Sequence, residues 1–119
     1  MSTTPPLSRV RIAGPTVYVS GQLPRGADGA IVAGGPRNQI RQALHNLEQA
    51  LASAQCTLAD VVKVTAWLTD ACHMAEFNLV YREFFAEPFP TRSTVVSALV
   101  VPEAIVEIEA VAYRGESGK

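Results

Sequence analysis

Residues 60–68 read DVVKVTAWL, and their side chains alternate in character as they do along a β-strand. Every second residue is apolar, and this set comprises Val62, Val64, Ala66 and Leu68. The intervening set is mixed in character and comprises Val61, Lys63, Thr65 and Trp67. Since successive side chains point to opposite faces, the pattern predicts a sheet with one face covered by helices and one mixed face.

Helices are predicted on both sides of this strand. Before it, apolar residues recur at three- and four-residue steps over residues 36–54, which indicates an amphipathic helix of about five turns. After it, a second helix is expected over residues 71–86, with Asp70 as its N-cap and Pro88 and Pro90 beyond its end. The apolar stripe of this helix consists of Met74, Phe77, Tyr81 and Phe84.

Residues 1–7 are expected to form a loose tail, and the other segments predict further strands. These strands are residues 8–12, 16–20, 92–99 and 104–113, with a short edge strand at 30–32. The order of elements predicts a single α+β domain over residues 1–119, in which two helices pack on one face of a mixed β-sheet.

The composition narrows the class of protein. The chain has 119 residues, of which 48% are hydrophobic and 18% charged, and its formal net charge is −1. This balance excludes a disordered chain, no apolar run reaches the ~20 residues of a membrane span, and no basic excess favours nucleic-acid binding. The N-terminal residues do not resemble a secretory signal, so we expect a cytoplasmic protein. There, Cys56 and Cys72 would be free thiols, with a single disulfide as the alternative.

The charged fraction is low for so small a chain. A domain of this size buries only about two-thirds of its unfolded surface, and 18% charged residues is below the usual ~25%. The predicted mixed face carries Tyr18, Lys63, Trp67, Glu107 and Glu109, with Arg92 as a further candidate. Two interpretations stay open: an oligomer interface that encloses polar clefts, or an ordinary half-exposed sheet with surface ion pairs.

Two residues on the predicted strands could carry chemistry. Arg92 follows the loop at residues 89–91, and a guanidinium binds a carboxylate through two parallel hydrogen bonds. Glu107 stands between two apolar residues, where a cleft would raise the pKa of its carboxyl and let it exchange protons with water. The alternative for both is an ion pair between Arg92 and Glu107 or Glu109. The histidines and cysteines form no recognisable metal-ligand set, so no metal site is expected.

Several segments that together span nearly the whole chain resemble the YjgF/YER057c/UK114 family, the reactive intermediate deaminases or Rid proteins. They are residues 19–22 (VSGQ), 39–47 (QIRQALHNL), 60–65 (DVVKVT), 77–85 (FNLVYREFF), 89–93 (FPTRS) and 106–110 (VEIEA). Each fragment is short, and it is their order and spacing that carry the resemblance.

The resemblance implies a fold like that of the small trimeric bacterial chorismate mutases, in which three chains pack their sheets into a barrel with a cleft at each subunit boundary. A homotrimer is therefore expected. It also implies hydrolysis of 2-imino acids and enamines, such as 2-aminoacrylate or 2-iminobutyrate, to a 2-keto acid and ammonia without metal or organic cofactor. The expected partner is this small imine carboxylate, with neither nucleic acid nor membrane.

The resemblance also assigns roles to residues of this chain. Arg92 matches the arginine that binds the substrate carboxylate, and Glu107 matches the carboxylate that orients or activates the attacking water. These two are the expected catalytic residues. Ser20 and Gly21 match the loop that lines the pocket, and Asn78 matches an asparagine on the pocket side of the second helix.

Three positions depart from the family pattern. Leu7 stands where many deaminases have a pocket tyrosine, Thr94 stands where a cysteine is common and can still hydrogen-bond, and Gln55 stands where a glycine often ends the first helix. Three alternative functions follow: a non-catalytic protein that binds small carboxylates, a Rid subgroup acting in ring-cleavage or pyrimidine catabolism, and an endoribonuclease. The last has least support, because the sequence pI is near 6.1 and the two histidines are scattered.

Overall fold

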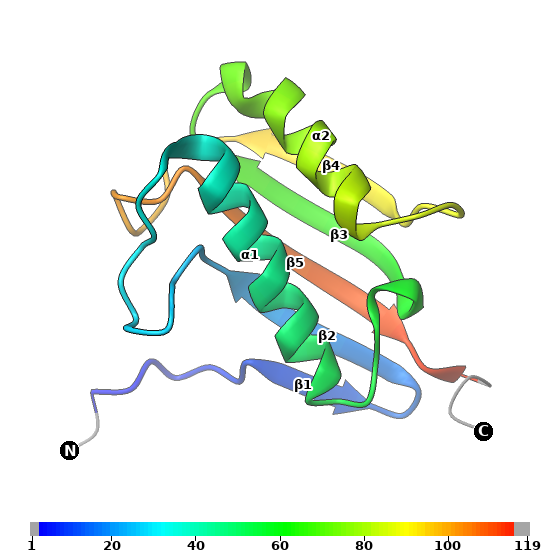
Figure 1. Cartoon of the computed structure of the whole chain (residues 1–119). Helices are drawn as coiled ribbons and strands as arrows, with labels where there is room; N and C mark the ends of the chain where they lie inside the picture. The colour runs from blue at the N-terminus through cyan, green and yellow to red at the C-terminus, as the bar shows by residue number, and fades with distance from the viewer. Residues whose placement is uncertain (1–2, 116–119) are drawn as a thin grey trace.

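The computed structural model describes residues 3–115. These residues form a five-stranded sheet in the order β1-β2-β5-β3-β4 together with two α-helices (Figure 1). The strands are β1 (Val10–Ala13), β2 (Thr16–Gln22), β3 (Val61–Leu68), β4 (Thr91–Val96) and β5 (Val106–Tyr113). The helices are α1 (Gly35–Ala52) and α2 (Met74–Phe84), and the short 3-10 turns are η1 (Leu58–Asp60) and η2 (Ala71–His73).

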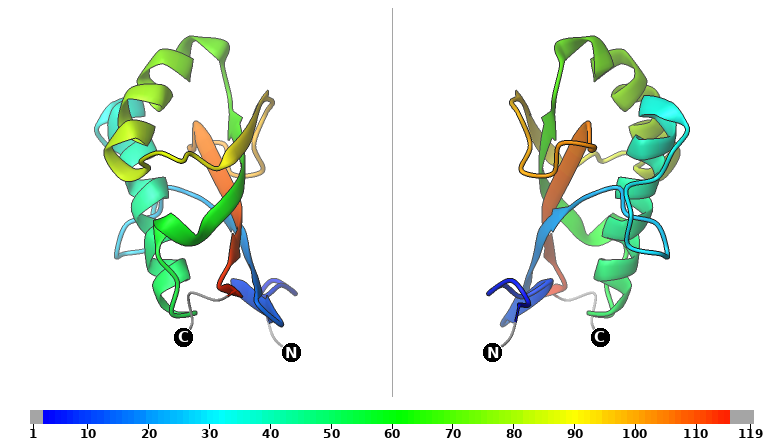
Figure 2. Two further views of the ribbon diagram at one scale, coloured as in Figure 1. Left: turned by 90° about the vertical axis from the view of Figure 1, so that its right-hand side faces the viewer. Right: turned by 90° about the vertical axis from the view of Figure 1, so that its left-hand side faces the viewer.

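The sheet is mixed, as the sequence predicts. Strands β3 and β4 are parallel because α2 forms the crossover between them, whereas the other neighbouring pairs are antiparallel. Both helices lie on the same face of the sheet, and no element of the described residues covers the opposite, open face (Figure 2). The predicted α+β class, with two helices on one face, is therefore confirmed.

The hydrophobic core lies between the helices and the sheet. The inward stripe of α1 has no exposed surface at Ile40, Leu44, Leu47 and Leu51. The sheet meets this stripe with alternate residues of β5, namely Val106, Ile108, Ala110 and Ala112. Burial of each large aliphatic side chain contributes about 1.5–3 kcal/mol, so this packing fixes which face of the sheet the helices cover.

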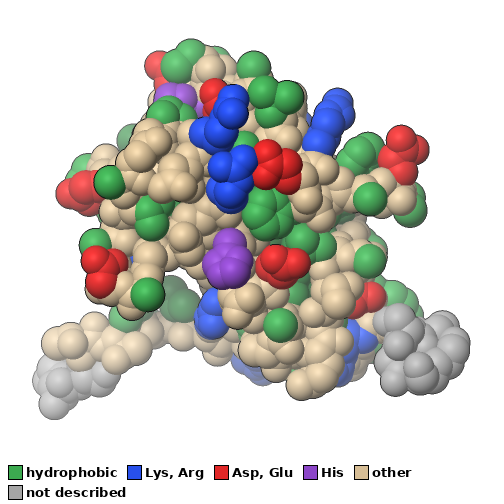
Figure 3. All heavy atoms as spheres, in the orientation of Figure 1, with side chains coloured by type: hydrophobic (Ala, Val, Ile, Leu, Met, Phe, Trp, Pro, Cys, Tyr) green, Lys and Arg blue, Asp and Glu red, His purple; other side chains and the backbone are tan. Residues whose placement is uncertain are grey.

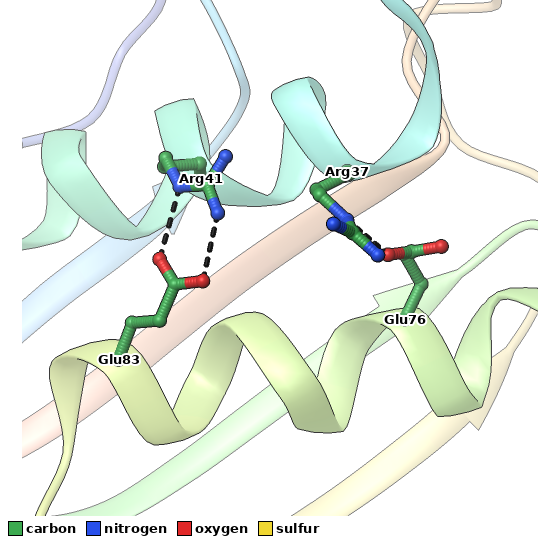
Figure 4. A network of polar contacts seen from close by, with 4 residues as sticks. All are labelled: Arg37, Arg41, Glu76 and Glu83. Atoms are coloured by element: carbon green, nitrogen blue, oxygen red, sulfur yellow. Dashed lines mark hydrogen bonds and ion pairs between the residues drawn. The ribbon is translucent and has the colours of Figure 1, made fainter.

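Two ion pairs join the helices on their outer side (Figure 4). The Nε and Nη2 atoms of Arg41 donate to the two carboxylate oxygens of Glu83, at 3.0 and 2.7 Å. This contact holds the pKa of Glu83 below its ordinary value. Arg37 makes the second pair with Glu76. Figure 3 shows arginine and acidic side chains gathered over the two helices. Both acidic side chains of α2 are therefore directed to α1.

The sequence placed several element boundaries wrongly. Residues 30–32 form no strand, because a tight turn leaves only the isolated bridge between Arg25 and Ile31. The second helix begins after η2 and ends at Phe84, two residues before its predicted end. Strand β4 ends at Val96, and β5 begins only at Val106. The ends of the predicted domain, residues 1–2 and 116–119, lie outside the described residues.

The prediction that Val62 lies on the helix-covered face is also wrong. The register of β3 against β5 shifts between Val61 and Lys63, which is the signature of a β-bulge. As a result Val61 is buried, whereas Val62 is 50% exposed. From Val64 onward the predicted alternation holds.

Gln55 adopts the left-handed conformation that explains why a glycine suits this position. Its φ is 57°, and the Gln55 N–H donates to the Ala52 carbonyl at 3.0 Å. The Cys56 N–H reaches the Leu51 carbonyl at 2.9 Å. These two bonds form the Schellman pattern that commonly ends a helix.

Replacing Gln55 with glycine should stabilise the protein. Left-handed backbone costs a non-glycine residue roughly 1 kcal/mol, and glycine relieves that cost. We expect Gln55→Gly to raise the free energy of unfolding by about 0.5–1 kcal/mol in urea denaturation. The matched control is Gln49→Gly, at an exposed position inside α1, which should lower it by about the same amount. A loss of stability in Gln55→Gly would contradict the assignment of this helix end.

Candidate functional site

Arg92 lies at the edge of the sheet and reaches toward α2. Arg92 pairs with the buried Val64 in the parallel β3–β4 register, so the Arg92 side chain leaves the sheet on the helix side. The Nη2 atom donates to Oδ1 of Asn78 at 2.8 Å. The guanidinium carbon stands 4.7 Å from the ring centre of Tyr81 and 5.2 Å from that of Phe77. A neutral amide and two aromatic faces therefore fix this cation.

The Arg92 side chain opens onto a cavity of about 350 Å³ between α2 and the start of β4. Its lining consists of Asn78, Tyr81, Arg82, Phe89, Pro90 and Arg92. No carboxylate is part of this lining, and among residues 3–115 Arg92 has no ion pair. The cavity therefore has the charge of an anion site. Its size falls in the range of small-molecule pockets.

Tyr81 is the buried floor of this cavity. Only 5% of its surface is exposed, and its hydroxyl is buried with no hydrogen-bond partner among the described residues. Burial raises the pKa of Tyr81 to about 12, although the nearby Arg92 cation acts in the opposite direction. Tyr81 therefore stays neutral and leaves the positive charge of Arg92 uncompensated.

Glu107 lies on the other side of the sheet. It faces Trp67 across the β3–β5 ladder, on the open face. Its carboxylate stands against Gly21, in the bulged part of β2, so closely that any side chain at Gly21 would collide with it. A cavity of about 230 Å³ lies here, lined by both residues together with Trp67, Glu109 and the loop at 97–100. Burial, with a smaller effect of Glu109, raises the pKa of the Glu107 carboxyl.

The two predicted catalytic residues therefore face opposite sides of one sheet. The prediction that Arg92 belongs to the mixed face is wrong, because its pairing with Val64 turns it toward the helices. The alternative of an ion pair from Arg92 to Glu107 or Glu109 is wrong within one chain, for the same reason. The other residues assigned to the mixed face, Tyr18, Lys63, Trp67, Glu107 and Glu109, do lie on the open face.

A family model described as endoribonuclease L-PSP matches residues 1–114. The chain belongs to this family. It is the YjgF/UK114 or Rid family that the sequence segments resemble, so that expectation is confirmed. The fold is chorismate mutase-like, as the resemblance implies.

Individual members of the YjgF/UK114 family are similar over most of their length. A 2-iminobutanoate/2-iminopropanoate deaminase of Bos taurus is 37% identical over 111 residues, which are 92% of this chain and 81% of the relative. The RutC family protein UK114 of Drosophila melanogaster is 39% identical, over 92% of this chain and 80% of the relative. The crystal structure of E. coli TdcF with bound serine has a TM-score of 0.86 and 33% identity, and covers 95% of this chain and 91% of that chain.

Of the remaining residues carried over from the YjgF/UK114 family, Asn78 lines the Arg92 cavity and Gly21 lines the Glu107 cavity, whereas Thr94 and Ser20 line neither. Asn78 joins Arg92, and Thr94 follows two positions along β4 on the same side of the sheet. Gly21 joins Glu107, but the Ser20 hydroxyl turns away and donates to the Ser8 carbonyl at 2.6 Å. Ser20 lines a neighbouring hollow that also contains Glu109.

Leu7 and the two cysteines lie outside both the Arg92 cavity and the Glu107 cavity. Leu7, where many family members have a tyrosine, is 66% exposed. Cys56 is buried and Cys72 exposed, and both are free thiols, as expected. The residues described hold no group of three or more metal-ligating side chains, and none of their helices is long and apolar enough to cross a membrane.

The sequence does not predict four residues that line the Arg92 cavity, namely Tyr81, Arg82, Phe89 and Pro90. Its periodicity assigns Tyr81 only to the buried stripe of α2, and it assigns Arg82 no role. A usable signal was present, since Asn78 and Arg82 are four residues apart and so share one face of a helix.

The raised pKa of Glu107 can be measured through Trp67, the one tryptophan of the chain. A charge that forms beside the indole changes its emission, so fluorescence should follow the ionisation of Glu107. We expect a midpoint above the ordinary glutamate value of ~4.3, because burial disfavours the charged form. Glu109→Gln should lower this midpoint by removing a like charge, and Glu107→Gln should remove the component of the transition that has the raised midpoint. A wild-type midpoint at or below the ordinary value would contradict the geometry.

Proposed function

We propose that this protein hydrolyses 2-imino acids and their enamine tautomers, such as 2-aminoacrylate or 2-iminobutyrate, to 2-keto acids and ammonia. The observation that carries the proposal is the Arg92 cation, which is fixed by neutral groups in a cavity without a carboxylate. Relatives named 2-iminobutanoate/2-iminopropanoate deaminase support the same reaction.

Arg92 would bind the substrate carboxylate. Its Nη2 is already engaged by Asn78, and its plane is set by the rings of Tyr81 and Phe77, so the remaining N–H groups keep one direction. A guanidinium held in this way offers two parallel hydrogen bonds to a planar carboxylate. The imine carbon next to that carboxylate is thereby positioned for attack.

Glu107 would move the protons of the reaction. The enamine first takes a proton at carbon and becomes the imine; water then adds to the C=N bond, and the resulting carbinolamine expels ammonia to leave the keto acid. A carboxylate whose pKa is raised is a stronger base, so it can accept a proton from the attacking water and return it to the leaving nitrogen. The reaction consumes one water and needs no electron acceptor.

A complete site would require two copies of the chain. Arg92 and Glu107 are on opposite sides of one sheet, so one protomer cannot present both to the same small substrate. The open face also exposes apolar residues, including Tyr18, Val95 and Tyr113, at 50%, 40% and 50%. We propose that three copies pack these faces together, and that each boundary joins the Arg92 cavity of one subunit to the Glu107 cavity of the next.

The second candidate is a protein that binds a small carboxylate without turnover. Two departures from the family pattern favour it, because Leu7 and Thr94 stand where many deaminases of the family have a tyrosine and a cysteine, and Leu7 is exposed. Endoribonuclease activity has weaker support. His45 lies on α1 and His73 lies in η2, and neither lines the Arg92 or the Glu107 cavity.

The reaction can be tested directly. A pyridoxal phosphate-dependent dehydratase generates 2-iminobutyrate in situ, and loss of the imine is followed with wild type, Arg92→Ala, Arg92→Lys and Glu107→Gln. Removing one partner of an enclosed charge pair costs roughly 2–5 kcal/mol, so Arg92→Ala should lower kcat/KM by about 30-fold or more. Arg92→Lys should recover part of this loss, because it keeps the charge without the bidentate geometry.

The outcomes separate the two candidates. Hydrolysis no faster than in buffer, combined with binding of 2-oxobutyrate, would establish the binding protein instead. Full activity in Arg92→Ala would overturn the assignment of the carboxylate site. Arg25→Ala, in the loop before α1, changes the net charge equally and should keep wild-type activity.

The assembly has its own test. If three chains pack their open faces together in a closed trimer, light scattering at micromolar concentration should give about three times the chain mass. A monomer mass would contradict the composite site, because one chain cannot complete it.

A further inference from the structure

The Arg92 cavity contains a second cation that the proposed reaction does not use. Arg82 lines the same cavity, and its own side chain is exposed. Among residues 3–115 it forms no ion pair, so the cavity holds two guanidinium groups and no carboxylate. Two uncompensated like charges in one small cavity create a positive potential that favours anions.

The arrangement of α2 explains why Arg82 stays unpaired. Its two acidic residues, Glu76 and Glu83, are engaged by Arg37 and Arg41 of α1, as Figure 4 shows. Glu83 is the sequence neighbour of Arg82, yet it points to the other helix. The helix thus turns its negative charges to one side and leaves its arginine on the side of the cavity.

The spacing of the two cations limits the ligand. Arg82 lies one helical turn beyond Asn78, and Asn78 holds the Nη2 of Arg92 at 2.8 Å. Four residues of helix rise about 6 Å along the backbone, so the two arginines approach the cavity from separate points. A ligand that engages both needs two anionic groups separated by a short carbon chain, as in a diacid of about four to five carbons. The remaining lining, Phe89 and Pro90, is apolar and suits the intervening carbons.

We propose that Arg82 is a specificity-determining residue and that the preferred substrates are 2-imino dicarboxylic acids. Arg92 binds the carboxylate next to the imine carbon, and Arg82 binds the carboxylate at the far end of the substrate. This inference rests on the proposed function, because it takes Arg92 as the carboxylate site of the reaction. The inference adds that the site selects substrates whose own side chain carries a carboxylate.

The test compares two stable product analogues of equal chain length. The dianion 2-oxoglutarate and the monoanion 2-oxopentanoate are titrated calorimetrically into the full-length protein at low and high salt. An exposed ion pair is worth a factor of about two to five in affinity, so 2-oxoglutarate should bind more tightly by about that factor at low salt. The preference should shrink at high ionic strength.

Variants assign the preference to its residue. Arg82→Gln should bring the two affinities together, whereas Arg25→Gln, with the same change of net charge, should keep the wild-type ratio. The inference would be overturned if wild type bound the two oxo acids with equal affinity, or if the ratio of affinities were unchanged in Arg82→Gln. In either case, binding of 2-oxopentanoate would still support Arg92 as the carboxylate site. Failure of both oxo acids to bind would instead overturn the proposed function.

Discussion

A side chain of a β-strand reaches only one face of its sheet, and this constraint governs how the protein can work. The pairing of Arg92 with Val64 sends the arginine to the helix side, and the pairing of Glu107 with Trp67 sends the carboxylate to the open side. Neither cavity alone contains both the Arg92 cation and the Glu107 carboxylate.

The helix layer serves the site as well as the core. Helix α2 packs inward through Phe77 and Tyr81, and the same rings support the guanidinium of Arg92. Its acidic residues are held by α1, which keeps negative charge away from the cavity. The packing that stabilises the fold therefore also sets the sign of the potential at the site.

The sequence predicted the elements that local periodicity controls and missed the features that depend on long-range pairing. Both helices and the open face follow from apolar spacing, because burial of one side enforces a period. The bulge at Val62 inverts that period by one residue, which alternation alone cannot reveal. The sheet face on which Arg92 lies depends on the β3–β4 register. Whether Arg82 lines the cavity depends on how α2 is turned about its axis. The family resemblance named Arg92 and Glu107 together but carried no information on which side of the sheet each lies.

If two subunits together complete one site, subunit mixing should restore activity to a pair of inactive variants. Arg92→Ala and Glu107→Gln chains are each assayed alone, then co-refolded in equal amounts and assayed again for imine hydrolysis. If each boundary takes Arg92 from one chain and Glu107 from the next, random mixing in a cyclic trimer makes about a quarter of the boundaries intact, and activity should return to about that fraction of wild type. A mixture no more active than the average of the two variants would show that both residues act within one chain, and would contradict the account.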